Sequence, residues 1–251
     1  MSPSSPGPLP SGPFVSPSPF VHFGPGTLGA ALRVVPAGEV AAFRASWDDL
    51  PPDTHLDADR PYRFRRYGSF RVHGRRLERL PHAAFFQHGT GRLFAPLTGS
   101  VAEGAVLRAL VLALRERLPG PGEGIDTCGV HQIRVTATAD TEGHPAPEGV
   151  HRDGHAYVAQ VLIHRQDVRG AESRLHAPGD GVADGARVLH RTTLSAPLET
   201  IILDDRRVLH DVSPLRPAPG AARGSRDMLL VDFFPAAGPH SGDSFTPITR
   251  T

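Results

Sequence analysis

The sequence predicts an α+β fold that is mainly β, with helices packed against one side of a sheet or barrel. Apolar residues recur at helical spacing in the first half of the chain. From His131 onward they form short runs rich in Val, Ile, Leu and Thr, separated by Gly, Pro and Asp clusters. Helices followed by strands indicate segregated layers, and 251 residues with 39% hydrophobic content suffice for one core.

Two helices are predicted in the first half. A short one covers 40–47 and stops before the proline pair at 51–52, and a longer one runs from about 103 to 118 before Pro119-Gly120. We expect both to bury an apolar stripe in the core. The residues at helical spacing are Val40, Phe43 and Trp47 in the first, and Leu107, Leu110, Val111, Leu114 and Leu118 in the second.

The second half is predicted to be mainly antiparallel β. Its apolar runs are His131 to Thr138, Tyr157 to His164, Glu199 to Leu203, Val208 to Val212, and Met228 to Phe234. We therefore expect one domain over 28–235, with a helical buttress over about 28–125 and a β core over about 126–235. The Pro/Ser/Gly-rich segment 1–27 is predicted to be a disordered tail, and 236–251 a C-terminal tail.

Composition favours a small-molecule partner. The 27 basic residues nearly balance 26 acidic ones, so the net charge of +1 gives no reason to expect nucleic acid or an anionic membrane. No secretory signal is evident, and no window approaches the roughly twenty apolar residues of a membrane span. Cys128 is the single cysteine, which excludes an intrachain disulfide and favours a reducing cytoplasm; we expect it to be buried and inert. The basic residues are all Arg, a mark of GC-rich coding that is compatible with specialised metabolism.

Three residues have the types and order of a two-histidine, one-carboxylate iron site. His151 and Asp153 are two apart, so in an extended segment both point to one face. His210 follows near the end of the β-rich half, where a rolled-up sheet could return it to the first pair. Such a triad covers one face of an octahedral Fe(II) and leaves the other open. With 14 histidines a chance His-x-Asp is expected about once, so a turn-capping His151 and a core His210 remain the alternative.

The charged run 204–207 and two further histidines are not assigned to the metal site. The charged run 204–207 precedes the strand that carries His210, and we expect it to be a solvated turn, with support of the metal ligands from behind as the alternative. His155 is expected to be exposed, and His131 to be packed in a strand.

Longer segments resemble the bacterial Fe(II)/2-oxoglutarate dioxygenase family that includes the free L-isoleucine 4-hydroxylases. The resemblance implies a double-stranded β-helix, or jelly roll of the cupin-like kind, with N-terminal helices buttressing one sheet. It covers about two fifths of the chain, from about Val130 to Phe233. The segments that carry it are Val130 to Arg134, Pro147 to Gly154, Gly170 to Ser173, Leu194 to Pro197, Leu203 to His210, and Arg226 to Leu230.

The resemblance also implies roles for individual residues. His151, Asp153 and His210 would hold Fe(II), and the cosubstrates would be 2-oxoglutarate and dioxygen. Arg226, sixteen positions after His210, would grip the distal carboxylate of 2-oxoglutarate. Many relatives have a serine two positions after this arginine. Met228 stands there in this chain, so Tyr157 or Ser213 is the expected neutral partner of 2-oxoglutarate.

The reaction implied is oxidative decarboxylation of 2-oxoglutarate to succinate, coupled to oxidation of an unactivated C–H bond. Hydroxylation of a free L-amino acid or a close derivative is the expected outcome, with desaturation or ring closure as variants. An amino-acid substrate needs a carboxylate clamp, for which Arg134 with Gln132 is the candidate, although Arg134 could equally form a structural ion pair. Its ammonium group needs an acidic partner, for which Glu148 and Glu172 are candidates.

Three other classes use similar residues. A cupin-like isomerase or metal-binding protein would share the barrel and the histidines but would not need Arg226. A zinc hydrolase would need a general base near the metal, and Glu148 is the nearest candidate in sequence. For a non-catalytic β-barrel binding module, metal removal would change nothing.

Overall fold

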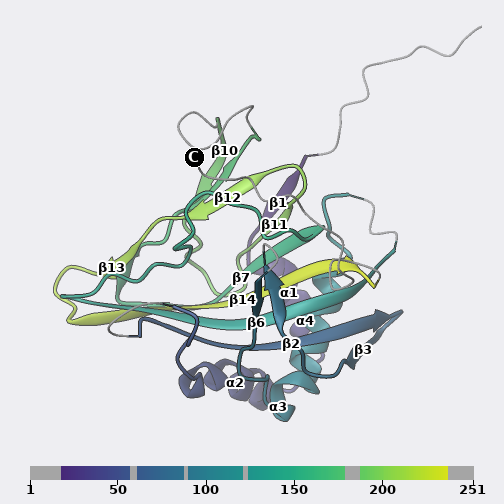
Figure 1. The fold of residues 1–251 in the computed structure, drawn as a ribbon. Helices are drawn as coiled ribbons and strands as arrows, with labels where there is room; N and C mark the ends of the chain where they lie inside the picture. The colour runs from purple at the N-terminus through teal and green to yellow at the C-terminus, as the bar shows by residue number, and fades with distance from the viewer. Residues whose placement is uncertain (1–17, 57–60, 88–89, 121–123, 179–186, 237–251) are drawn as a thin grey trace, which may run out of the picture.

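Two facing antiparallel sheets form the centre of the molecule, and helices cover the outer face of the larger one (Figure 1). The computed structural model describes residues 18–56, 61–87, 90–120, 124–178 and 187–236. The large sheet has the strand order β1-β11-β7-β14-β6-β2-β3, and a small sheet has the order β10-β9-β12. This arrangement is the double-stranded β-helix that the family resemblance implied.

The strands of the large sheet are β1 (Phe20–Phe23), β2 (Arg63–His73), β3 (Arg76–Arg79), β6 (Ile125–Thr138), β7 (Tyr157–Gln166), β11 (Thr200–Asp204) and β14 (Arg223–Pro235). The remaining strands are β4 (Phe85–Gln87), β5 (Thr90–Arg92), β8 (Val168–Gly170), β9 (Ser173–His176), β10 (Val188–Thr192), β12 (Leu209–Val212) and β13 (Leu215–Pro217). The helices are α1 (Gly26–Leu32), α2 (Ala37–Ala45), the 3-10 helix η1 (Ser46–Asp49), α3 (Gly99–Ala102) and α4 (Ala105–Arg115).

The helices and the large sheet share the main hydrophobic core. On α4, Leu107, Leu110 and Leu114 are fully buried at helical spacing and belong to the same cluster as Val231 and Phe233 of β14. Each such side chain contributes about 1.5–3 kcal/mol on burial. The predicted helix over 103–118 is therefore confirmed in its core, although the chain forms the separate turn α3 before it.

Trp47 anchors the first predicted helix to the sheet. It is fully buried, and its indole N–H donates to the backbone oxygen of Ile133 on β6 at 3.2 Å. The helix that carries its apolar stripe is α2, continued by η1. A buried indole needs such an acceptor, so this bond fixes where η1 crosses β6.

Alternation along the central strands divides their side chains between two environments. On β6, His131, Ile133 and Val135 line the cavity between the sheets. Gln132 and Arg134 bond instead to η1, through Ser46 and Asp48. Because the side-chain period of a strand is two, each strand residue has one environment or the other.

Two expectations about the N-terminal half are corrected. The segment 28–125 is not only helical, because β2 and β3 extend the large sheet beside β6. Charged residues occupy the inner face of β2, so the strand lacks the apolar pattern by which the others are found. The predicted tail over 1–27 contains β1, which pairs with β11. Residues 1–17 and 237–251, also predicted as tails, lie outside the described residues.

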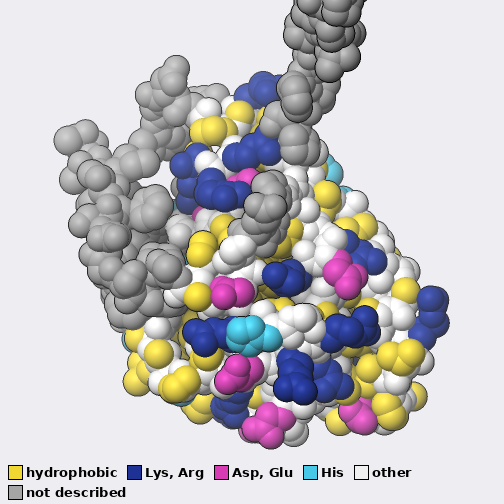
Figure 2. Space-filling model, turned by 90° about the vertical axis from the view of Figure 1, so that its right-hand side faces the viewer, with side chains coloured by type: hydrophobic (Ala, Val, Ile, Leu, Met, Phe, Trp, Pro, Cys, Tyr) yellow, Lys and Arg dark blue, Asp and Glu magenta, His cyan; other side chains and the backbone are white. Residues whose placement is uncertain are grey.

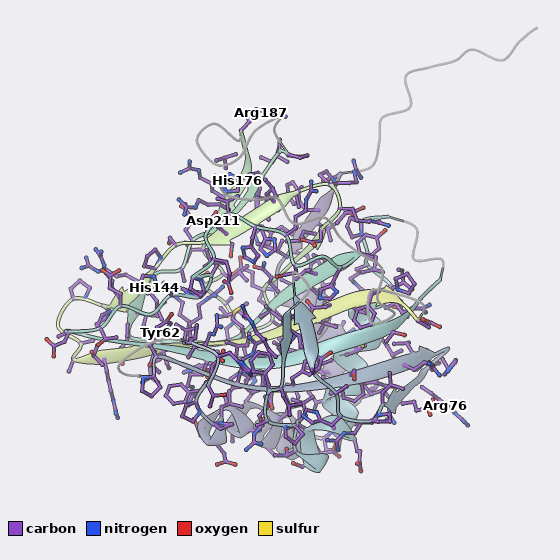
Figure 3. The ribbon with its side chains drawn as sticks, viewed as in Figure 1. Tyr62, Arg76, His144, His176, Arg187 and Asp211 are labelled. Atoms are coloured by element: carbon purple, nitrogen blue, oxygen red, sulfur yellow. The ribbon has the colours of Figure 1, made fainter. Side chains whose placement is uncertain are left out.

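Polar contacts tie the small sheet together. His176 on β9 lies beside Asp211 on β12 (Figure 3), with 2.8 Å between its Nε2 and the Asp211 Oδ1. Arg174 also pairs with Asp211. Over the outer face shown in Figure 2, arginine and acidic side chains are interspersed, in keeping with the net charge of +1.

Candidate active site

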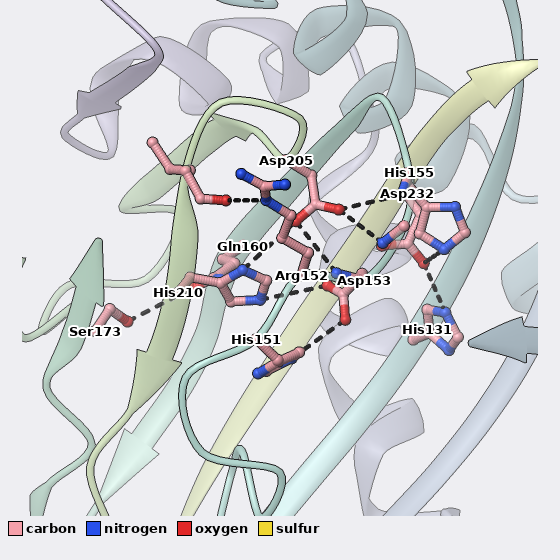
Figure 4. A network of polar contacts seen from close by, with 12 residues as sticks. His131, His151, Arg152, Asp153, His155, Gln160, Ser173, Asp205, His210 and Asp232 are labelled. Atoms are coloured by element: carbon pink, nitrogen blue, oxygen red, sulfur yellow. Dashed lines mark hydrogen bonds and ion pairs between the residues drawn. The ribbon is translucent and has the colours of Figure 1, made fainter. Parts of the chain in front are cut away.

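The structure brings His151, Asp153 and His210 together in the lining of one cavity, and Figure 4 shows the three side chains side by side. Each offers one ligand atom, and these atoms lie within 4.8 Å of one another. Asp153 stands between the histidines, with its carboxylate oxygens 3.3 Å from His151 Nε2 and 3.4 Å from His210 Nε2. The predicted meeting of His151 and Asp153, two residues apart, with the distant His210 is therefore found in the structure.

The backbone sets the two histidines opposite each other. His151, in the loop after β6, forms an isolated antiparallel bridge with His210 on β12. The two residues exchange N–H to carbonyl hydrogen bonds of 3.0 and 2.9 Å. Directly opposed strand residues lie about 5 Å apart, and the imidazole ring centroids are 4.5 Å apart.

Hydrogen bonding leaves Nε2 of His151 free to act as a metal ligand. Its Nδ1–H donates to the carbonyl of Gly149 at 2.8 Å, so Nε2, which lies 3.3 Å from Asp153 Oδ1, is the nitrogen left to bind a metal. Burial lowers the pKa of His151, but the hydrogen bond and charge of Asp153 outweigh it and raise the pKa to about 9. Burial likewise raises the pKa of Asp153, and the two histidines bring it well below its usual range. This pairing keeps the Asp153 carboxylate ionised, as a metal ligand must be.

Asp205 holds the loop that carries these residues. Its carboxylate accepts the backbone N–H groups of Asp153, Gly154 and His155, at 3.2, 2.7 and 3.1 Å. It also lies 3.7 Å from His210 Nδ1. Asp204 and Asp205 are 4% and 1% exposed, so the expectation of a solvated turn over 204–207 is wrong at both acidic residues.

Arg226 on β14 lines the same cavity as the triad. It is buried, and its Nε and Nη2 have no hydrogen-bond partner among the described residues. Burial, and to a lesser extent Arg165, lower its pKa to about 9, so it stays charged near neutral pH. A buried cation without a partner is costly, and a carboxylate entering the cavity would supply one. The apolar lining residues are Phe85, Ile133, Val135, Val212, Met228 and Leu230.

The two residues predicted as neutral partners of 2-oxoglutarate are not in the cavity. Tyr157 belongs to the core cluster on the helix side of β7, and Arg206 lies over its ring at 4.9 Å. The Ser213 hydroxyl accepts the backbone N–H of Glu172 at 2.9 Å. Neither lines the cavity, whereas Gln160, on the inner face of β7, does.

The predicted substrate clamp is also placed elsewhere. Arg134 donates two bonds of 2.7 Å to Asp227 and one of 2.9 Å to Asp48, on the helix side of the sheet. The Gln132 amide donates to Ser46, also on that side. Glu172 is half-buried and faces Arg191 at 3.9 Å. Of the four predicted substrate residues, Glu148 alone lines the cavity, where it lies 3.5 Å from Arg92.

Several cavity residues were not singled out from the sequence. Gln160 and Asp232 each interrupt an otherwise apolar strand, which is the signal that could have revealed them. Asp232 accepts from His131, and His155 is buried beside it rather than exposed as expected. Arg63 and Arg65 lie on β2, a strand that the sequence did not predict. Cys128 is buried, as expected.

Comparison with known proteins decides the family. The family model described as 2OG-Fe dioxygenase matches residues 44–232. The chain belongs to the 2OG-Fe dioxygenase family. A crystal structure of a bsmA homolog (Mpe_A2762) from Methylobium petroleophilum PM1 is 31% identical, with 88% of this chain and 90% of that one covered and a TM-score of 0.73.

Two further structures share the fold of this dioxygenase. IDO from Bacillus thuringiensis has a TM-score of 0.69 at 19% identity, covering 86% of this chain and 93% of that one. The Fe(II)/(alpha)ketoglutarate-dependent dioxygenase TqaL has a TM-score of 0.67 at 19% identity, covering 92% and 87%. No curated protein matches the chain in sequence.

The family uses Fe(II), 2-oxoglutarate and dioxygen, and the cavity suits them. Two imidazoles and one carboxylate are a donor set for non-haem Fe(II). The unpartnered Arg226 guanidinium suits a buried carboxylate, such as that of 2-oxoglutarate. Among the helices of the described residues, none is long and apolar enough to cross a membrane.

Proposed function

We propose that this dioxygenase binds Fe(II) through His151, Asp153 and His210 and oxidises a C–H bond of a free L-amino acid or a close derivative. The observation that carries the proposal is the buried Arg226, whose Nε and Nη2 have no hydrogen-bond partner among the described residues, in the same cavity as the triad. A metal-binding isomerase or a zinc hydrolase would not need such a cation. When bound, Fe(II) with 2-oxoglutarate and dioxygen supplies an oxidant for unactivated C–H bonds.

The protein residues bind and orient the metal and the substrates, and they exclude water from the site. The triad supplies ligands on one side of the metal only, which leaves room for the cosubstrates. Arg226 holds the distal carboxylate of 2-oxoglutarate through charge-assisted hydrogen bonds. Gln160 replaces Tyr157 and Ser213 as the neutral partner, because it lines the cavity and they do not.

The amino-acid class rests on the resemblance to the free L-isoleucine 4-hydroxylases and on the cavity walls. Ile133, Val212 and Met228 offer an aliphatic surface, on which a hydrocarbon side chain would lose its hydration. Glu148 is the acidic group for the substrate ammonium, since it is the one predicted acid that lines the cavity. Hydroxylation, in specialised metabolism, is the outcome we propose.

The direct test is succinate formation from 2-oxoglutarate. Protein loaded anaerobically with Fe(II) is exposed to air with each of a panel of aliphatic and basic L-amino acids, beside a His210→Ala control. We expect at least one amino acid to stimulate succinate formation, and the control to abolish it. Product mass then separates hydroxylation, which adds one oxygen, from desaturation or ring closure, which remove two hydrogens.

Two negative outcomes have different meanings. If wild-type protein binds Fe(II) and 2-oxoglutarate but no amino acid stimulates turnover, the free amino-acid class is wrong. Failure to bind either the metal or 2-oxoglutarate would refute the catalytic proposal itself.

A further inference from the structure

We propose that Arg63 and Arg65 of β2 form the binding site for the carboxylate of the substrate; this rests on the proposed function and assigns the clamp that Arg134 does not provide. Both arginines line the cavity that contains the triad. They are two apart on a strand, so their side chains share its inner face. Both are buried, at 4% and 7% exposure.

One carboxylate serves both arginines. Arg63 Nε–H donates to Asp53 Oδ2 at 2.8 Å, and Arg65 Nη1 lies 3.7 Å from the same oxygen. Asp53 is itself buried and accepts the backbone N–H of His55 at 3.0 Å. Two buried cations therefore share one directly paired anion, Asp53.

The two guanidinium groups are held in place, but some of their N–H donors lack an acceptor. Arg65 lies 3.8 Å over the Phe94 ring and donates through Nη2 to His131 Nδ1 at 2.6 Å. His131 in turn donates through Nε2 to Asp232 at 2.9 Å. Arg65 Nε and Arg63 Nη2 remain buried without a hydrogen-bond partner among the described residues. Burying these donors unpaired is costly, and a carboxylate that enters the cavity would accept their hydrogen bonds.

Among the described arginines that line the cavity, this pair is the one left for a second carboxylate. Arg92 also lines the cavity but lies 3.5 Å from Glu148, which balances its charge. Burial, and then the charge of Arg63, lower the pKa of Arg65 to about 10, so it remains protonated near neutral pH. A pre-oriented, dehydrated cation pair suits the planar carboxylate of an organic acid.

The pair is separate from the site proposed for 2-oxoglutarate. Arg63 lies opposite Val135 of β6, which lies opposite Arg226 of β14. With one strand between them, the Arg63 and Arg226 backbones are about 10 Å apart. Two carboxylates can therefore bind at once, with 2-oxoglutarate on Arg226 and the substrate on Arg63 and Arg65.

The test is isothermal titration calorimetry on anaerobic protein loaded with Fe(II) and 2-oxoglutarate, so that binding is read without turnover. The twenty proteinogenic L-amino acids are the probes. Each amino acid that binds is compared with its carboxamide, which keeps the ammonium group and the side chain. We expect the carboxamide to bind at least about tenfold more weakly, the loss of a charge-assisted hydrogen bond.

Variants then assign the loss to the pair. Arg65→Gln should weaken the amino acid about tenfold or more and leave 2-oxoglutarate affinity within about twofold. Arg226→Gln should do the reverse. Arg66→Gln is the matched control, because Arg66 is the next residue on β2 but donates to the backbone oxygens of Asp49 and Pro96 on the other side. Circular dichroism checks that each variant folds. Arg65→Lys keeps the positive charge but loses the two-pronged guanidinium donor, so it should weaken amino-acid binding less than Arg65→Gln does.

The inference and the proposed function fail in different ways. Equal binding of acid and carboxamide, or unchanged amino-acid affinity in Arg65→Gln, would overturn the carboxylate site alone. If no amino acid bound wild-type protein that had bound 2-oxoglutarate, both the free amino-acid class and this site would be overturned. Loss of 2-oxoglutarate rather than amino-acid affinity in Arg65→Gln would show that the two sites are exchanged.

Discussion

At the scale of single residues, Asp205 has a larger structural part in the site than its sequence context indicates. It sits in a charged run, yet it accepts three successive backbone N–H groups of the loop that carries Asp153. Burial, then the charge of Asp153, raise its pKa to about 6. Its neighbour Asp204 pairs locally with Arg206, so adjacent acidic residues have different tasks.

We predict that Asp205→Asn weakens metal binding by roughly ten- to a hundredfold, which is the usual effect of losing a residue that orients the metal ligands through hydrogen bonds. An amide has one acceptor oxygen, so it cannot hold all three N–H groups as the carboxylate does. Titration of the anaerobic protein with Fe(II), in the presence of 2-oxoglutarate, measures the change. Asp204→Asn is the control and should bind the metal as wild type does; equal affinity in both variants would show that Asp205 does not position the ligands.

At the scale of elements, β6 shows how strand alternation separates site from scaffold. His131 and Ile133 line the cavity. Arg134, also on β6, points to the other side and pairs with Asp227 of β14 and Asp48 of η1. Asp227 is 2% exposed, so removal of Arg134 would leave a buried carboxylate unpaired. The role of Arg134 is therefore to attach the helical layer to the sheet.

We predict that Arg134→Leu lowers the free energy of unfolding by roughly 1–3 kcal/mol, because it leaves the buried Asp227 without its partner. Urea denaturation measures the change. Adding Asp227→Asn should recover part of the loss, since the amide carries no charge. The Michaelis constant for the amino acid should not change; a rise in that constant without a loss of stability would restore Arg134 as a substrate residue.

At the scale of the whole molecule, the site exists only because the chain folds back on itself. Asp153 follows β6, His210 lies on β12 and Arg226 lies on β14, so no single segment carries the site. An unfolded chain has no such arrangement. Binding of metal and 2-oxoglutarate is therefore coupled to global folding.

We predict that Mn(II) and 2-oxoglutarate, each at about one hundred times its dissociation constant, together raise the thermal unfolding midpoint by roughly 10–20 °C. One such ligand contributes about 2.7 kcal/mol, and each kcal/mol corresponds to roughly 2–4 °C for a chain of this size. Differential scanning calorimetry measures the shift. His210→Ala should lose most of it, and an equal shift in that variant would place the metal elsewhere.

Sequence alone determined the fold class and the candidate triad. Periodicity located the core of α4 and the strands β6, β7, β11, β12 and β14, because period 3.6 and period 2 are local properties of the chain. The spacing of His151 and Asp153 is local in the same sense. The resemblance supplied the jelly roll and the choice of Arg226, and the structure places that residue in the cavity with the triad.

Tertiary structure decided which polar residues face the cavity. Arg134 and Arg65 are both arginines on strands that are neighbours in the sheet, yet one faces the helices and the other the site. Tyr157 and Gln160 on β7 are separated in the same way. Strand pairing sets these faces, and a shift of register by one residue would exchange them. Pairing joins segments far apart in the chain, so local pattern could not show that β2 carries the second cationic group.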